Sequence, residues 1–267
     1  MQELAVEQRR RVGRRAAWHV GDLAWGFRCH EGREREWRIR LWEEGGSVVA
    51  WSWLKMSDGT LDFDVRVDRR ELLEEILDEA DARIVYAFED DDEVAEALAR
   101  RGFGPGDAKP LHFHAGPLDR PPEPPPLPDG FRYGTVEPDE LPERVAAHRD
   151  VWNPSRVTAS SYAKLVATWP YRASLDCVVE APDGRTAAYC LAWPDDENGV
   201  GEFEPVGVRD EFRRRGLGAA VCTFALRRLW DEGMREAIVY CVQKPACALY
   251  DAVGLPHHST MAGWQRG

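Results

Sequence analysis

An arginine- and glycine-rich loop in the second half of the sequence has the residue types of an anion-binding site. It runs Arg213-Arg214-Arg215-Gly216-Leu217-Gly218 and leads into a stretch with helical periodicity that starts near Ala219. Because the two glycines lack a Cβ atom, backbone N–H groups can turn toward a phosphate, and a helix N-terminus adds positive potential. The three arginines can pair with a diphosphate. The loop therefore predicts a site for a pyrophosphate-bearing cofactor.

Two common phosphate loops are excluded by their spacing. A dinucleotide-binding fingerprint needs a third glycine three residues after Gly218, where this chain has Val221. A Walker loop needs adjacent glycine and lysine, and this pair does not occur in the chain.

The remaining pattern is V-x-V-x-x-x-x-R-x-x-G-x-G, from Val206 to Gly218. It resembles the acyl-CoA signature of the GNAT superfamily of N-acetyltransferases. Downstream, "PACALYDAVGL" at residues 245–255 is similar to that family's A-x-x-L-Y-x-x-x-G-F helix, with Tyr250 in the tyrosine position. The resemblance implies acetyl-CoA as co-substrate. It also implies a set of cofactor-binding residues: Val206, Gly207, Val208, Arg213, Arg214, Arg215, Gly216, Leu217, Gly218 and Ala219.

Two carboxylates precede the loop and could take the proton of an attacking amine. Glu202 and Glu204 lie two residues apart on a predicted strand and therefore on the same face. Glu202 has the spacing to Arg213 at which some GNAT enzymes carry their base, whereas Glu204 lies nearer the expected acetyl group. The alternative for both is an ion pair at the sheet surface.

The same strand could also stabilise the thioester oxygen. Pro205 has no N–H group and Gly207 loosens the ladder, so we expect a bulge that turns the backbone of Val206 and Val208 toward the cofactor. The resemblance then implies that the Val206 N–H binds the oxyanion and that Tyr250 protonates the leaving thiolate. Alternatively, the ring of Tyr250 only packs. Two departures from the family pattern are Gln243 ahead of the tyrosine helix and Leu255 in place of phenylalanine.

These residues require a particular series of elements. We expect strands over residues 174–180, 186–193, 201–208 and 237–242, with helices over 139–152, 159–169, 219–231 and 245–255. The first half follows a similar order: strands over 36–43, 47–56, 60–67, 83–88 and 110–116, and helices over 69–82 and 93–101.

Three segments of the first half match segments of the second, which indicates an internal duplication. "DFDVRV" matches "EFEPVGV", "ARIVYAF" matches "EAIVYCV", and "EVAEALARRGF" matches "ACALYDAVGL". The first copy has Leu98 at the tyrosine position, no glycine after Val67, and a markedly shorter predicted loop. We therefore expect it to be a degenerate copy that has lost cofactor binding.

The expected fold is α/β (α+β), with two tandem GNAT-like domains, each a mixed, mostly antiparallel sheet flanked by helices. The first domain spans residues 1–118 and the second 129–267. The segment between them, residues 119–128, is rich in proline, which disfavours both helix and central strand.

The amino-acid composition limits the classes of binding partner and the cellular location that we expect for the protein. The net charge of −12 argues against nucleic-acid binding and favours cationic substrates such as amines. No apolar run is long enough to span a membrane, and the N-terminus lacks a secretory signal, so we expect a cytoplasmic protein whose terminal arginines are solvated. We expect the six cysteines to be buried free thiols, and no motif predicts a metal site. They are Cys29, Cys177, Cys190, Cys222, Cys241 and Cys247.

The prediction is an N-acetyltransferase that moves an acetyl group from acetyl-CoA directly to a primary amine of a small molecule in a ternary complex. One alternative is a non-catalytic acyl-CoA sensor, which would not need Glu202, Glu204 or Tyr250. Another is a protein N-acetyltransferase whose first copy docks the target. The sequence does not fix the acceptor, the acyl chain or the oligomeric state.

Overall fold

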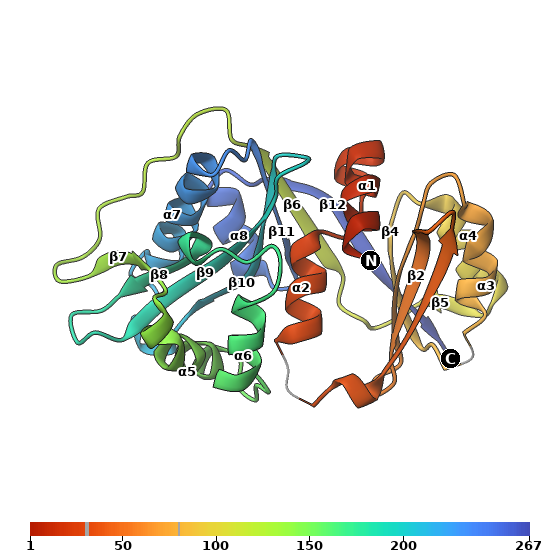
Figure 1. Cartoon of the computed structure of the whole chain (residues 1–267), viewed down its shortest axis with the longest axis horizontal. Helices are drawn as coiled ribbons and strands as arrows, with labels where there is room; N and C mark the ends of the chain where they lie inside the picture. The colour runs from red at the N-terminus through yellow and green to blue at the C-terminus, as the bar shows by residue number, and fades with distance from the viewer. Residues whose placement is uncertain (30–31, 80) are drawn as a thin grey trace.

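A computed structural model describes residues 1–29, 32–79 and 81–267. The chain forms two lobes joined by a continuous sheet, with the first half on the right and most of the second on the left in Figure 1. The predicted α/β (α+β) class is confirmed. None of the helices in the described residues combines the length and apolar composition needed to span a bilayer.

The first half is a small sheet with two helices on its outer face. Alternating apolar residues of β3, among them Leu61 and Val65, pack against Leu73, Ile76 and Leu77 of α3 to form its core. The elements are β1 (Trp37–Glu44), β2 (Ser47–Lys55), β3 (Thr60–Val65), α3 (Leu73–Leu77), β4 (Ile84–Phe88), α4 (Asp92–Arg100) and β5 (Phe103–Pro105).

The second half has a larger core around α7. Its strand β9 is buried along its whole length, and Val221, Ala225 and Leu229 of α7 pack against that sheet. The elements are β7 (Arg132–Thr135), α5 (Leu141–Val151), α6 (Ala159–Val166), β8 (Asp176–Glu180), β9 (Thr186–Asp195), β10 (Val200–Val208), α7 (Leu217–Asp231), β11 (Glu236–Cys241) and α8 (Lys244–Ala252).

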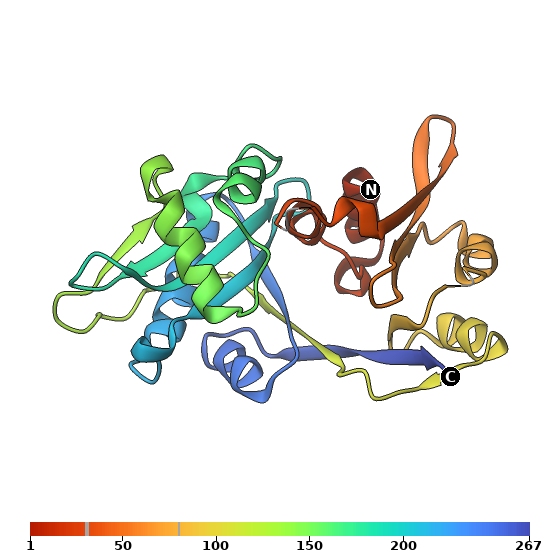
Figure 2. The same ribbon diagram turned by 90° about the horizontal axis from the view of Figure 1, so that it is seen from below.

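The two halves exchange their last strands. β6 (Leu111–Pro117), from the first half, pairs antiparallel with β11 of the second, and β12 (His257–Arg266), from the chain's C-terminal end, pairs with β4 and β5 of the first. β6 and β12 also pair with each other. The order is β1-β2-β3-β4-β12-β6-β11-β10-β9-β8-β7, with β5 on β12. Figure 2 shows β12, in blue, reaching the first half.

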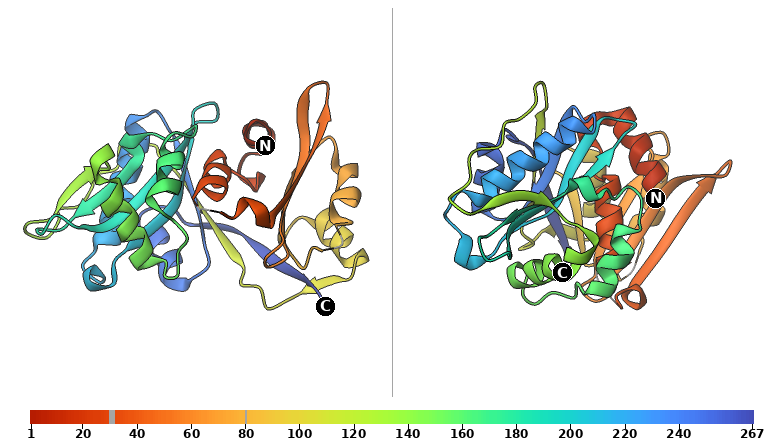
Figure 3. Two further views of the ribbon diagram at one scale, coloured as in Figure 1. Left: turned by 60° about the horizontal axis from the view of Figure 1, so that its bottom comes forward. Right: turned by 60° about the vertical axis from the view of Figure 1, so that its left-hand side comes forward.

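The N-terminal segment is helical, which the sequence reading missed. α1 (Gln2–Val12) and α2 (Val20–Arg28) lie between the two lobes (Figure 3, left). The prediction of solvated arginines is wrong for Arg9, which is buried and donates from Nη2 to the carbonyl oxygens of Ala16 and Trp18. Leu4 and Leu23 pack against Trp51 and Trp53, so the helices are part of the fold.

Two other expectations differ from the structure. The predicted helix over 69–82 is only a short 3-10 turn, Arg70–Leu72, followed by the five-residue α3. The predicted difference in loop length is also wrong, because residues 66–72 separate β3 from α3 and residues 209–216 separate β10 from α7, seven residues against eight. The first copy lacks the glycines, not the length. The proline-rich residues 119–128 carry no helix or strand, as predicted.

The strand exchange makes a prediction about the proposed boundary at 119–128. Expressed separately, fragments 1–118 and 129–267 should aggregate or unfold non-cooperatively, because each would expose an unpaired strand edge. Expressed together, they should form a 1:1 complex, measured by size-exclusion chromatography and thermal unfolding. The control is the full-length chain, folded first and then cleaved within the linker. A monomeric 129–267 fragment with the melting temperature of the whole chain would contradict this expectation.

Candidate active site

The glycine loop forms an uncapped helix N-terminus. Gly216, the N-cap residue of α7, has φ +78°, and Arg214 has φ +60°, so the chain turns through the left-handed region twice before the helix. No side chain of the described residues caps α7. The first-turn N–H groups of Leu217, Gly218 and Ala219 are the groups that such a terminus leaves for an anion. This geometry fits a diphosphate.

The neighbouring arginines are exposed beside this terminus. Arg213 donates from Nε to the carbonyl oxygen of Val208 at 3.2 Å, and its Nη2 lies 2.8 Å from Asp210. The Arg215 guanidinium lies over the ring of Phe212. The three arginines thus surround the end of β10 and the start of α7.

β10 and β11 separate just ahead of this loop. They are paired in parallel only from Val200–Glu202 to residues 236–238, after which β10 continues along β9 and β11 along β6. The predicted bulge is confirmed by a register shift between Phe203 and Val206. At Gly207 a Cβ atom would lie 2.4 Å from the ring of Tyr189, so only glycine fits there.

Glu202 is buried at this separation and held by the first half. It is 1% exposed, the Asp22 N–H donates to its Oε2 at 3.0 Å, and His19 Nδ1 lies 3.2 Å from the same oxygen. Burial, followed by the charge of Glu204, raises the pKa of Glu202 to about 8. Burial, followed by the charge of Arg9, lowers the pKa of His19 to about 4.

The hydrogen bonds of His19 place the proton. Its Nδ1 accepts from the Gly21 N–H at 3.1 Å, so Nδ1 is the unprotonated nitrogen, and Nε2 donates to the Val200 carbonyl oxygen. Because the single lone pair of Nδ1 is used by the Gly21 N–H, the contact with Glu202 does not fix the Glu202 proton. The raised pKa of Glu202 favours its protonated form at neutral pH.

Asp22 and His19 are site residues that the sequence reading missed. Burial, followed by the charge of Glu202, raises the pKa of Asp22 well above its ordinary value. Asp22 Oδ2 accepts from the His19 N–H at 2.9 Å, which completes a capping box at the start of α2. This capping box is a sequence signal that could have predicted the start of α2, but nothing in the sequence shows that α2 packs against β10.

Glu204 lies beside a cavity that Glu202 does not line. The cavity has a volume of about 670 Å³, and Glu204, Asp22 and Tyr240 contribute to its wall. Burial, followed by the charge of Asp22, raises the pKa of Glu204 to about 8. The backbone carbonyl of Glu204 accepts from Trp193 Nε1 at 2.6 Å. The two glutamates, which were predicted to share one face of the strand, therefore have different surroundings. Glu202 is held by His19 and the Asp22 N–H, whereas Glu204 lines the cavity.

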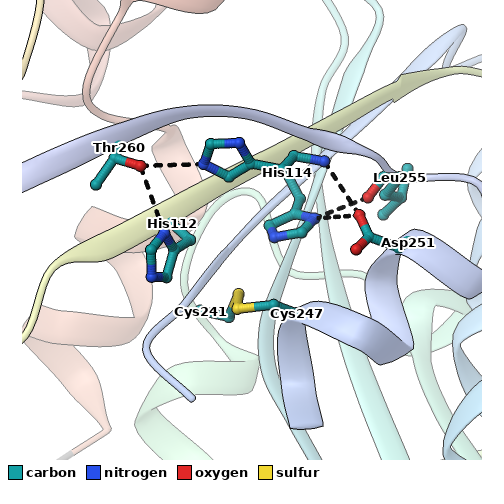
Figure 4. Close-up of a disulfide and its surroundings, with 8 residues drawn as sticks. His112, His114, Cys241, Cys247, Asp251, Leu255 and Thr260 are labelled. Atoms are coloured by element: carbon teal, nitrogen blue, oxygen red, sulfur yellow. Dashed lines mark hydrogen bonds and ion pairs between the residues drawn. A yellow bond between two sulfur atoms is a disulfide. The ribbon is translucent and has the colours of Figure 1, made fainter. Parts of the chain in front are cut away.

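Tyr250 lies on α8, which is fixed to the sheet from both ends. A disulfide joins Cys241 at the end of β11 to Cys247 in α8, and His114 of β6 donates from Nδ1 to the Leu255 carbonyl oxygen at 2.9 Å just past the helix (Figure 4). The prediction of free thiols is therefore wrong for Cys241 and Cys247 but holds for the other four cysteines, which are buried and unbridged. Burial raises the pKa of Tyr250, which is 6% exposed, well above its ordinary value, so it stays protonated.

Comparison with known proteins identifies the second half. The model of the acetyltransferase (GNAT) family matches residues 143–255, which include both glutamates, the glycine loop and Tyr250. These residues form a GNAT-family domain. The predicted family is thereby confirmed, and GNAT acetyltransferases transfer acyl groups from acyl-CoA.

Solved structures show the same fold over nearly the whole chain. A GCN5-related N-acetyltransferase from Sphaerobacter thermophilus has a TM-score of 0.68 at 18% identity, covering 99% of this chain and 90% of its own. A tandem GNAT protein from the clavulanic acid biosynthesis pathway has a TM-score of 0.68 at 16% identity, covering 98% and 93%. A GCN5-related N-acetyltransferase from Kribbella flavida has a TM-score of 0.59 at 16% identity, covering 88% of this chain and 91% of its own. No curated protein matches the sequence.

The GNAT domain brings the predicted residues to one place. Glu202, Glu204 and residues 206–208 lie along β10, residues 213–219 form the loop after it, and Tyr250 packs in the same core as β10 and α7. The groups that the sequence did not supply, His19 and Asp22, come from the other half. Both halves thus contribute residues to the candidate site.

Replacing Glu202 by glutamine should alter how stability depends on pH. The raised pKa means that the folded protein keeps a proton that the unfolded chain, with an ordinary pKa of about 4.3, releases, so stability falls as pH rises from about 4 to about 8. Glu202→Gln removes this loss, on the order of 5 kcal/mol over the whole range at about 1.4 kcal/mol per pKa unit. Denaturant unfolding from pH 5 to 9 measures it, with the exposed Glu123→Gln as control. Parallel pH curves for Glu202→Gln and the parent would contradict it.

A negative charge at the α7 N-terminus should separate helix stability from cofactor binding. Gly218→Asp adds a carboxylate that the helix dipole favours but a diphosphate opposes. A Cβ at Gly218 meets its neighbours, Val208 and Leu249, no closer than 3.4 Å, so the substitution can be accommodated. We expect acetyl-CoA affinity to fall by about tenfold or more in Gly218→Asp, with no loss of melting temperature. Gly218→Asn is the uncharged control in calorimetry, and equal affinities for the two variants would refute the assignment.

Proposed function

We propose that this protein is an N-acetyltransferase that moves an acetyl group from acetyl-CoA to a primary amine of a small molecule. The observation that carries the proposal is the position of Glu204. It lies on the strand that separates from β11 ahead of the glycine loop, and it lines the cavity between the halves. A thioester held along β10 and an amine in the cavity would meet at this carboxyl group.

The proposed cofactor contacts follow β10 and the loop. The N–H groups of Leu217, Gly218 and Ala219 and the side chains of Arg213, Arg214 and Arg215 bind the diphosphate, and Gly216 gives the turn. Residues 206–208 offer backbone groups to the pantetheine arm in the gap between β10 and β11. Bound acetyl-CoA supplies an activated acetyl carbonyl and a thiolate leaving group.

Glu204 is the proposed base. Its pKa of about 8 suits it to take a proton from an ammonium group near neutral pH, whereas Glu202 is already engaged by His19 and the Asp22 N–H. The freed amine nitrogen attacks the thioester carbonyl carbon. The C–N bond forms, the Val206 N–H stabilises the oxyanion, and the C–S bond breaks as Tyr250 gives its proton to sulfur. The new amide nitrogen then loses its remaining extra proton, which restores the Tyr250 hydroxyl group.

Direct transfer is favoured over a covalent enzyme intermediate. Burial raises the pKa of the Cys29, Cys177 and Cys190 thiols, which disfavours a nucleophilic thiolate at these positions. Cys222 is buried as well, and the remaining two cysteines are joined in the disulfide. None of the described cysteines is therefore suited to act as a nucleophile, which supports direct transfer in a ternary complex.

Glu204→Gln should lower kcat by about 10²–10⁴-fold, the usual range for a lost general base. Because the base must be deprotonated, kcat/KM should rise with pH and level off above about 8, and this limb should be lost in Glu204→Gln. Initial rates of CoA release over a panel of amines from pH 6 to 10 measure both. Glu202→Gln, two residues away and outside the cavity wall, is the matched control and should keep most of the rate. Acetyl-CoA binding without CoA release from any amine would instead support a sensor.

A further inference from the structure

The cavity beside Glu204 reaches deep into the first half. Its wall includes residues 61–65 of β3, residues 86–88 of β4 and the start of α4, in addition to Glu204 and Tyr240 from the second half. β3 and β4 are paired in parallel only at Thr60–Leu61 and then separate. The cavity therefore occupies the gap of the first copy that corresponds to the β10–β11 gap of the second.

The backbone of this gap is already taken by side chains of the N-terminal segment. Gln8 donates from Nε2 to the Val65 carbonyl oxygen at 2.8 Å and accepts from the Val67 N–H at 3.2 Å. Trp18 donates from Nε1 to the Phe63 carbonyl oxygen at 2.7 Å. A pantetheine arm would need backbone groups of this kind, and here they are already hydrogen-bonded to side chains. The gap therefore cannot bind acyl-CoA in this way, although a cavity remains beside it.

The charge of the cavity wall selects against a phosphate. Eight residues with carboxyl groups line the cavity, but only two arginines do. Both arginines pair with carboxylates, Arg15 with Asp90 and Arg70 with Asp91 and Glu93. Within the described residues, four of the lining carboxyl groups form no ion pair. They are Asp22, Asp64, Asp92 and Glu204.

Asp64 carries a buried oxygen that faces no donor. The residue is 8% exposed, and its Oδ1 accepts from Gln8 Nε2 at 3.2 Å, while Oδ2 has no hydrogen-bond partner among the described residues. The nearby arginines make their hydrogen bonds to other groups: Arg9 donates from Nη2 to the carbonyl oxygens of Ala16 and Trp18, and Arg70 donates to Asp91 and Glu93. Burial raises the pKa of Asp64 to about 6, so its charged form is costly in the empty cavity, and a ligand cation would stabilise it.

Much of the remaining wall is apolar. Val12, Phe63, Phe88, Leu111 and Met261 contribute to it, between carboxyl groups that come from both halves. Such a surface suits methylene groups, and its carboxylates suit ammonium groups. An aliphatic chain with a cation at each end matches both features.

We propose that this cavity binds an aliphatic diamine or polyamine, with the amine to be acetylated at Glu204 and a second ammonium group at Asp64. The proposal rests on the function proposed above and specifies its acceptor. The first half thus contributes a cation site where its former cofactor gap lies.

The test compares α,ω-diaminoalkanes with amino alcohols of the same chain lengths, which keep one amine and lose the second charge. We expect kcat/KM for the better diamines to exceed that of the matched amino alcohols by about tenfold or more. Asp64→Asn should raise KM for diamines to that for amino alcohols, with kcat and the amino alcohol kinetics unchanged. Asn can still accept from Gln8, so the fold should persist. Asp139→Asn, on the exposed surface, is the control for net charge.

Calorimetry without acetyl-CoA distinguishes failure of this inference from failure of the proposed transfer. If no amine is acetylated, diamine binding that is lost in Asp64→Asn still supports the cavity as a diamine site, and absence of binding overturns it. Equal kinetics for diamines and amino alcohols, or no effect of Asp64→Asn, overturns it as well. Two molecules of acetyl-CoA bound per chain would do the same, because the first-half gap would then be a cofactor site.

Discussion

The Glu202 carboxyl group belongs to one half of the molecule and is held by the other. It lies on β10, at the last point where β10 pairs with β11, and its partners are the Asp22 N–H and the His19 ring at the start of α2. A buried carboxyl group without such partners would destabilise the strand. The place where the two strands separate, and with it the position of Glu204, therefore depends on how the halves pack together.

The two halves have similarly placed gaps in their sheets but differ around them. Both have a parallel strand pair that separates after a few residues, β3–β4 in one and β10–β11 in the other. In the second copy a glycine loop and a 15-residue helix follow. In the first copy the helix has five residues, and Gln8 and Trp18 cover the strand edge. The two gaps therefore differ both in the helix that follows and in the side chains that cover the strand edge.

Local patterns in the sequence predicted most strands and helices and the glycine loop, because alternation, helical periodicity and turn residues act over short distances. The bulge followed from Pro205 and Gly207 in the same way. The parts that the sequence did not supply depend on contacts between distant segments. α1 and α2 carry helix-forming residues, but their burial between the lobes, and the contact of Asp22 with Glu202, join residues 180 positions apart. The Cys241–Cys247 pair was missed because no C-x-x-C spacing marks it.

The exchange of β6 and β12 has an evolutionary consequence for a copy without a cofactor loop. Removing the first half from the gene would also remove β6, the strand that covers the edge of β11 next to Tyr250's helix. Truncation would therefore damage the half that retains the family signature. Such interlocking makes the outer strand of the first half indispensable to the second half, whereas the interior of the first half is free to change.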